Sequence, residues 1–234
     1  MTLLALEHVG KRYVDGPHER PLLNDVSLDL APGELAAVWG LRRSGRSTLL
    51  RVAAGIERPD TGVVRFDGRD LVDHGEDVLG EGIGYVQKAL RGAEAQSVLE
   101  EVMVCLLARG ISRAAAHARA CTALERTGSA QCAALAPRQL DKAESVRVAL
   151  ARTLVLSPRV LVVDEPVNGV DLHERDGILL LLRSLADEGV AVLASTGQST
   201  GLSGADRALA LSDGELRGSP SQQLAPVLAL RRSA

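Results

Sequence analysis

Short apolar runs alternate with longer amphipathic stretches along much of the chain. Three runs are apolar and of strand length, which predicts strands buried on both faces: Leu35–Trp39, Val160–Val163 and Val190–Ser195. Helical patterns follow the first two runs, at Thr48–Ala54 and Gly177–Glu188. Strands that alternate with helices usually pair in parallel, because each connection crosses a face of the sheet. We therefore expect an α/β fold with a mainly parallel sheet flanked by helices.

The N-terminal part of the chain carries strand and turn signals. Leu3–Val9 and Lys11–Val14 predict two short strands around a turn at Gly10. Another strand is predicted at Val26–Leu30, before the turn residues 31–34, and residues 61–68 predict a hairpin-like element. The sequence thus predicts paired strands on both sides of the first helix.

Residues 98–132 change to an alanine-rich helical pattern, interrupted at Gly110 and Gly128. The chain has 234 residues, 46% of them hydrophobic, and a formal net charge of −3. These values are typical of a globular protein, and they give no indication of a nucleic-acid partner. We expect a single domain over residues 1–222, with a helical subdomain at about 89–145 and a tail at 223–234.

No apolar run approaches the length of a membrane span, and the first residues lack the pattern of a secretory leader. We therefore expect any association with a membrane to depend on a partner protein. The three cysteines, Cys105, Cys121 and Cys132, lack metal-ligand spacing and are interpreted as small apolar residues.

The most informative motif lies at residues 40–48, between the first buried strand and its helix. Gly40 and Gly45 have the spacing of a phosphate-binding P-loop, in which backbone N–H groups turn inward to form an anion-binding nest. Arg46 stands where this motif requires lysine. It keeps the positive charge, but its planar guanidinium is larger and prefers bidentate contacts. The predicted nucleotide-binding residues of the loop are Gly40, Ser44, Gly45, Arg46, Ser47 and Thr48, with Ser47 also a Mg²⁺ ligand.

A second motif ends the strand Val160–Val163 with two acids and a proline. A buried central strand delivers such carboxylates to its C-terminal edge. Asp164 would hold the Mg²⁺ of a bound nucleotide, and Glu165 would polarise the attacking water as a general base. The alternative is a strand that simply ends in a solvated acidic turn.

Together these motifs resemble the nucleotide-binding subunits of ABC transporters, over about residues 3–218. Residues 164–171 look like that family's Walker B motif and D-loop, and residues 147–152 look like the helix after its signature motif. The spacing of the elements is most similar to the lipoprotein-release and macrolide-exporter branch. The resemblance implies a P-loop fold of the ABC type, with a parallel core, an antiparallel β-subdomain and a helical subdomain. It also implies ATP and Mg²⁺ as ligands.

The resemblance extends to single residues and to partners. Tyr13 falls where the family places an aromatic that stacks on adenine, although a strand packing role is the alternative. Gln87 resembles the glutamine of the Q-loop, a nucleotide and Mg²⁺ contact, but comes one residue early. The implied partners are a transmembrane permease and a second ATP-binding subunit, as a homodimer or as a heterodimer with an intact ATPase. The implied location is the cytoplasmic face of the cell membrane.

Several positions depart from the family pattern. The signature falls on Leu140 to Glu144, so that its serine and both glycines are lost, and a register at residues 135–139 lacks the motif as well. Gly197 stands where the switch histidine is expected, and Arg43 replaces a glycine of the P-loop. The altered signature residues are Asp141, Lys142, Ala143 and Glu144.

These departures favour a degenerate subunit that binds nucleotide weakly or not at all, hydrolyses it slowly, and has a structural or regulatory role beneath a permease. The alternative is an active transport ATPase that tolerates Arg46, which the retained Glu165 supports. A third reading, an ABC protein that acts on DNA or ribosomes, usually requires paired nucleotide domains or a long coiled-coil insertion, and 234 residues accommodate neither.

Overall fold

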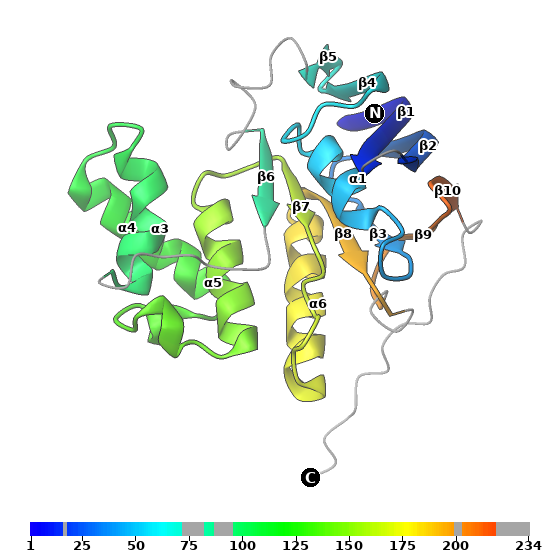
Figure 1. Ribbon diagram of the computed structural model, residues 1–234. Helices are drawn as coiled ribbons and strands as arrows, with labels where there is room; N and C mark the ends of the chain where they lie inside the picture. The colour runs from blue at the N-terminus through cyan, green and yellow to red at the C-terminus, as the bar shows by residue number, and fades with distance from the viewer. Residues whose placement is uncertain (16–17, 72–81, 87–95, 199–202, 219–234) are drawn as a thin grey trace.

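A six-stranded sheet in the order β10-β9-β3-β8-β7-β6 forms the centre of the protein (Figure 1). A computed structural model describes residues 1–15, 18–71, 82–86, 96–198 and 203–218. All neighbouring strands of this sheet are parallel except β9 and β10. The strands are β3 (Leu35–Trp39), β6 (Ile83–Val86), β7 (Val160–Val163), β8 (Ala191–Thr196), β9 (Arg207–Ser212) and β10 (Glu215–Gly218).

The two faces of this sheet pack against different helices. Ala36 and Val38 on β3 belong to a core shared with α1 (Arg46–Ala53), whereas Leu35 packs with α5 (Lys142–Leu154) and α6 (Leu172–Asp187). Every residue of β7 and β8 is buried. The expected α/β fold with helices on the faces of a mainly parallel sheet is therefore confirmed.

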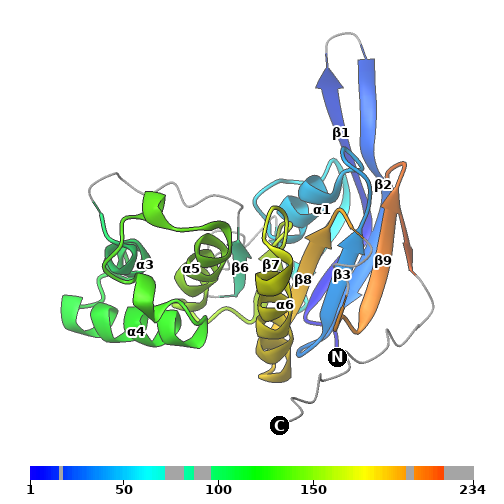
Figure 2. The same ribbon diagram turned by 90° about the horizontal axis from the view of Figure 1, so that it is seen from below.

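A four-stranded antiparallel sheet in the order β2-β1-β4-β5 packs beside α1. Figure 2 shows the β1–β2 hairpin at the opposite end of the molecule from α3 and α4. The strands are β1 (Leu4–Asp15), β2 (His18–Leu30), β4 (Thr61–Phe66) and β5 (Arg69–Asp70).

The predicted turn at Gly10 is wrong, because β1 is one strand whose register shifts on both sides of Val9. Gly10 lies opposite Thr61 of β4, where a Cβ atom would overlap the Thr61 hydroxyl oxygen. The glycine therefore allows two strands to approach closely at a bulge and does not form a turn.

Helices α3 (Val98–Leu107), α4 (Arg113–Arg126) and α5 form a separate cluster at the other end of the molecule (Figures 1 and 2). Gly110 and Gly128 have φ values of 74° and 66°, and they follow α3 and α4 as the sequence predicts. The predicted boundaries of the helical subdomain and of the tail remain predictions, because residues 89–95 and 223–234 lie outside the described part. No helix within the described ranges is both long and apolar enough to span a membrane.

Two leucines of α6 test the interface between this helix and the sheet. Leu182 is 1% exposed and Leu180 is 62% exposed. We expect Leu182→Ala to lower the free energy of unfolding by about 2–5 kcal/mol, because it leaves a cavity against β3, β7 and β8. Leu180→Ala is the matched control and should change it by less than about 0.5 kcal/mol. Urea denaturation measures both, and equal losses would contradict this packing.

Candidate nucleotide-binding site

Three parallel strands, β3, β8 and β7, end side by side at one edge of the sheet. Trp39 of β3 pairs with Thr196 of β8, and Val163 of β7 pairs with Ala194 of β8. The loops that follow these strands therefore meet, which is where α/β sheets bind ligands. A cleft of about 830 Å³ lies there, lined by Tyr13, Leu22, Arg42, Arg43, Ser44, Gly45, Arg46, Ser47, Thr48, Glu165, Val167, Asn168, Thr196, Gly197 and Gln198.

Most of the predicted site residues line this cleft. Gly40 and Asp164 do not line the cleft, although each is within two positions of a residue that does, and Gln87 falls outside the described residues. The altered signature residues 141–144 begin α5 and do not line it either.

The loop before α1 requires its two predicted glycines. Gly45 has φ 98°, and a Cβ atom there would lie 2.6 Å from the Leu22 carbonyl oxygen. At Gly40 a Cβ atom would lie 2.6 Å from the Leu211 carbonyl oxygen. Arg43 has φ 67°, a left-handed conformation that favours glycine. The loop thus keeps the backbone of a P-loop despite its altered side chains.

Helix α1 begins at this loop with Gly45 as its N-cap, and within the described ranges it has neither a side-chain cap nor an acidic residue in its first turn. Its first backbone N–H groups are therefore available to an anion, and the helix dipole favours negative charge there. The Ser44 hydroxyl is also buried and has no hydrogen-bond partner among the described residues. The geometry fits a phosphate group.

Arg46 extends from this helix toward the acidic end of β7. Its Nη2 lies 2.7 Å from Oε1 of Glu165, and the side chains are 7% and 14% exposed. Its Nη1 is buried without a hydrogen-bond partner in the described part of the chain. A Cβ atom at Gly197 would lie 3.4 Å from Nη2 and 3.6 Å from Nη1. The guanidinium therefore packs against the position where a switch histidine was expected.

Both carboxylate oxygens of Glu165 accept hydrogen bonds. Asn168 Nδ2 donates to Oε2 at 2.7 Å, while Arg46 occupies Oε1. The backbone N–H of Glu165 donates to the Ser195 hydroxyl at 2.9 Å, and that hydroxyl donates to Asp164 Oδ1 at 2.7 Å. Glu165 has φ 48°, an unusual conformation for a residue with a side chain. Asn168 and Ser195 had no predicted role, although Ser195 ends a predicted strand at the same sheet edge.

The donors for a metal ion are few but suitable. Ser47 offers a hydroxyl in the cleft, and Asp164 is a buried carboxylate at the end of β7. Burial and the negative charge of Asp164 raise the pKa of Tyr85 to about 12. Magnesium is commonly held by one carboxylate and completes its shell with phosphate oxygens and water. The residues present therefore fit a nucleotide-bound Mg²⁺.

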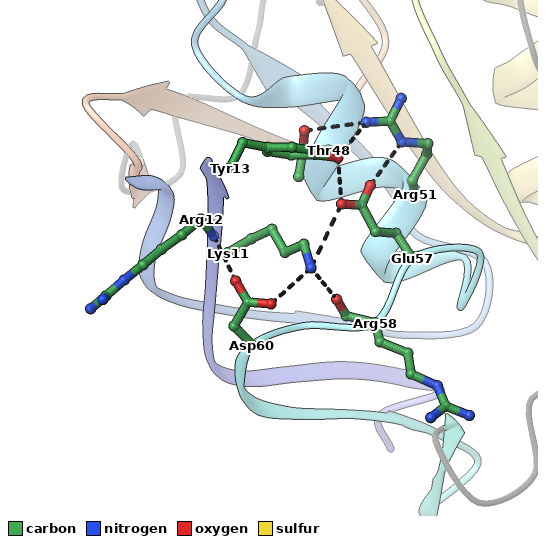
Figure 3. Close-up of polar contacts among 8 residues, drawn as sticks. All are labelled: Lys11, Arg12, Tyr13, Thr48, Arg51, Glu57, Arg58 and Asp60. Carbon is green, nitrogen blue, oxygen red and sulfur yellow. Dashed lines mark hydrogen bonds and ion pairs between the residues drawn. The ribbon is translucent and has the colours of Figure 1, made fainter. Parts of the chain in front are cut away.

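Tyr13 lines the cleft from β1 and is 39% exposed, so it is not a buried packing residue. Its hydroxyl donates to Glu57 and accepts from Arg51 Nη2 at 3.2 Å (Figure 3). These two partners were not predicted, because they lie 38 and 44 positions from Tyr13 along the chain, in α1 and in the segment after it. An exposed ring with a fixed hydroxyl leaves its faces available for stacking.

The N-terminus of α5 differs from that of α1, because the chain's own carboxylates cap it. Asp141 is the N-cap, and its Oδ1 accepts from the Glu144 N–H at 2.8 Å. Glu144 Oε2 accepts from the Asp141 N–H at 3.0 Å in return. This capping box explains chemically why Asp141 and Glu144 suit a helix start. It also places two carboxylates where the resemblance implies a phosphate contact.

The fold and the cleft together define a P-loop nucleotide-binding protein. A family model described as ABC transporter matches residues 23–168. The lipoprotein-releasing system ATP-binding protein LolD of Maricaulis maris is 36% identical over 219 residues, which cover 92% of this chain and 96% of the relative. The chain therefore belongs to the ABC transporter family, in the branch that includes LolD.

Two further comparisons agree with this family. The macrolide export ATP-binding/permease protein MacB 1/2 of Paracoccus denitrificans is 33% identical over 92% of this chain, which spans 33% of that longer protein. The dimeric structure of the ATP-binding cassette MJ0796 bound to ADP and Pi has a TM-score of 0.85 at 26% identity, and the match covers 93% of this chain and 98% of that one. The predicted branch and ABC-type fold are thus confirmed.

A pair of glycine substitutions tests the close contact in the P-loop. Gly45 and Gly68 both have positive φ, 98° and 77°, but a Cβ atom at Gly68 meets no described residue within 4 Å. Both alanine variants should lose about 1–2 kcal/mol for the left-handed conformation. Gly45→Ala should lose about 1–3 kcal/mol more, because its methyl group overlaps the Leu22 carbonyl. Urea unfolding measures the difference, and identical losses would show that the contact at Gly45 is unimportant.

Proposed function

We propose that this chain is the ATP-binding subunit of a transporter complex, held beneath a membrane permease on the cytoplasmic face, with weak or absent ATP hydrolysis and a structural or regulatory role. Residues 1–222 would form its single nucleotide-binding domain. The observation that carries this proposal is the ion pair between Arg46 and Glu165 in the cleft.

The ion pair engages the group that hydrolysis needs. A general base has to accept a proton from water through a carboxylate oxygen within hydrogen-bond reach. In this cleft Glu165 Oε1 accepts from Arg46 and Oε2 accepts from Asn168. An attacking water therefore has to share these oxygens with two existing donors, one of them charged.

The same ion pair affects phosphate binding. Arg46 is the residue at the P-loop lysine position, and one of its amino groups is directed to Glu165. Its other amino group, Nη1, remains a buried donor without a partner in the described residues. We infer that Arg46 bridges Glu165 and a phosphate oxygen when nucleotide is present. Mg²⁺ on Ser47 and Asp164 would neutralise further phosphate charge.

The ends of α5 and β8 supply two further arguments for slow hydrolysis. Asp141 and Glu144 place negative charge at the N-terminus of α5, which the resemblance implies should face the phosphate bound to a second subunit. Gly197 offers no side chain to organise an attacking water. The dimeric arrangement of MJ0796 supports a second ATP-binding subunit as partner, and the relation to LolD and MacB supports a membrane permease.

One observation favours the alternative, an active transport ATPase. Asp164 and Glu165 are both present and are joined through Ser195 at the edge of an open cleft. If nucleotide binding draws Arg46 away from Glu165, the carboxylate becomes available to water. The two functions differ in whether turnover depends on Glu165.

The substitution Glu165→Gln distinguishes the two functions. In the complex co-purified with its membrane partner, we expect low Mg·ATP turnover that changes by less than about twofold in Glu165→Gln. A working general base contributes about 100-fold or more, so a loss of that size would contradict the proposal and establish an active ATPase. Phosphate release under steady-state conditions is the measurement.

The substitution Arg46→Lys tests whether Arg46 causes the low turnover. Arg46→Lys replaces the planar guanidinium by the compact ammonium group that the P-loop motif requires, so turnover should rise and become sensitive to a second substitution, Glu165→Gln. Arg42→Lys is the matched control, because Arg42 lines the same cleft but is exposed. Turnover that stays low in Arg46→Lys would place the defect at the residues of α5 or at Gly197.

A further inference from the structure

Three side chains form a closed set of hydrogen bonds at the Tyr13 end of the cleft (Figure 3). The Tyr13 hydroxyl donates to Glu57 Oε1 and accepts from Arg51 Nη2 at 3.2 Å. Arg51 Nε donates to Glu57 Oε2 at 3.0 Å, which closes the ring. Both the donor and the acceptor capacity of the hydroxyl are thus used, and the direction of the phenol is fixed.

A second layer of contacts holds Glu57 in place. Its side chain is 18% exposed, and Lys11 Nζ lies 3.9 Å from Oε1. Lys11 itself donates to Asp60 Oδ1 at 2.8 Å and to the Arg58 carbonyl at 2.9 Å. The hydrogen bond from Lys11 and the N–H of Arg12 lower the pKa of Asp60. Glu57 therefore contacts two cations whose positions are set by other partners.

This arrangement links two parts of the fold that meet different ends of the cleft. Tyr13 belongs to β1 of the antiparallel sheet, whereas Arg51 belongs to α1, the helix that begins at the P-loop. Arg51 Nη2 also lies 3.5 Å from the hydroxyl of Thr48, a residue of the P-loop motif. The distance between the exposed ring and the phosphate loop is consequently set by the contacts of Arg51 and Glu57.

We propose that Glu57 and Arg51 are positioning residues that hold the Tyr13 ring at a fixed distance from the P-loop, so that the cleft selects a nucleotide over a polyphosphate without a base. The inference rests on the proposed function, because it takes the cleft to bind nucleotide. A phenol without such contacts rotates about its side-chain bonds, and a base that stacks on it has to restrict that rotation at a cost in conformational entropy. The hydrogen bonds of the Tyr13 hydroxyl with Glu57 and Arg51, here called the tether, restrict the rotation before the base binds.

The alternative is a tether that only joins β1 to α1. Loss of a merely structural link would disturb the P-loop helix and weaken the binding of every ligand that contacts this helix. Loss of a positioning contact would weaken only ligands that carry a base, because phosphates bind the loop at residues 40–48. The comparison of ATP with inorganic tripolyphosphate distinguishes these roles.

The experiment is calorimetric titration of the full chain with Mg·ATP and with Mg·tripolyphosphate. Tyr13→Phe keeps the ring and removes its hydroxyl, and Glu57→Gln removes the charge that holds Arg51. We expect each variant to weaken ATP binding about fivefold, as for one lost hydrogen bond, with tripolyphosphate binding unchanged within about twofold. The double variant should be no weaker than either single variant, because both break one shared contact.

Two control variants accompany this experiment, one expected to weaken ATP binding more strongly and one expected to leave the binding of both ligands unchanged. Tyr13→Ala removes the stacking surface and should weaken ATP about tenfold or more without affecting tripolyphosphate. Asp67→Asn removes the negative charge from a 2.8 Å ion pair with Arg159, whose two residues do not line the cleft, and it should change neither affinity. If Glu57→Gln fails to fold, Tyr13→Phe still tests the tether, because it removes only an oxygen atom from a partly exposed side chain.

Equal loss of both ligands in Tyr13→Phe, or no loss of ATP binding, would overturn the positioning role. A wild-type chain that binds tripolyphosphate as tightly as ATP would overturn it too, while leaving phosphate binding by the P-loop intact. A wild-type chain that binds neither ligand would overturn nucleotide binding itself and the inference with it. The wild-type titration thus separates failure of the proposed function from failure of the tether.

Discussion

The parallel pairing of β3, β8 and β7 is the constraint on which the site depends. β8 lies between the other two strands, so the P-loop, the acidic pair and Gly197 emerge at one sheet edge. Ser195 at the end of β8 then joins Asp164 to the backbone of Glu165. A one-residue slip of β8 would turn its buried side chains to the opposite face and separate these groups. The register of these three strands therefore determines which groups meet at the edge.

One steric and electrostatic unit is formed by Arg46, Glu165 and Gly197. In the sequence these residues are unconnected: Arg46 and Gly197 differ from the family pattern, whereas Glu165 agrees with it. The guanidinium pairs with Glu165 and lies against Gly197, where a Cβ atom would be in van der Waals contact with it. A buried ion pair offsets its desolvation cost only when its remaining groups are satisfied. Glu165 gains a second donor from Asn168, whereas Nη1 of Arg46 stays without a partner among the described residues. Each carboxylate oxygen of Glu165 thus has a donor, whereas one nitrogen of the guanidinium lacks an acceptor among the described residues. This arrangement favours the binding of an anion.

Periodicity and motif spacing predicted β3, β7, β8 and α1, because these elements are buried or amphipathic along their whole length. They did not predict β9 and β10, whose short strands mix buried and exposed residues. The turn at Gly10 was wrong because local sequence does not reveal a close approach to Thr61 of another strand. The contact between Arg46 and Glu165 could not be predicted either, since 119 residues separate them. Sequence located the groups of the site, and only the fold shows which groups neutralise one another.

The two helix N-termini named by the motifs have opposite electrostatic properties. α1 begins without a side-chain cap, whereas α5 begins with a carboxylate capping box. Under the proposed function, two copies of this chain would each offer an anion-accepting P-loop and an α5 that repels phosphate. Pairing with a subunit whose signature helix lacks such carboxylates removes the repulsion from the site built on this chain's P-loop. The capping box thus stabilises α5 locally and disfavours any phosphate placed against the first turn of this helix.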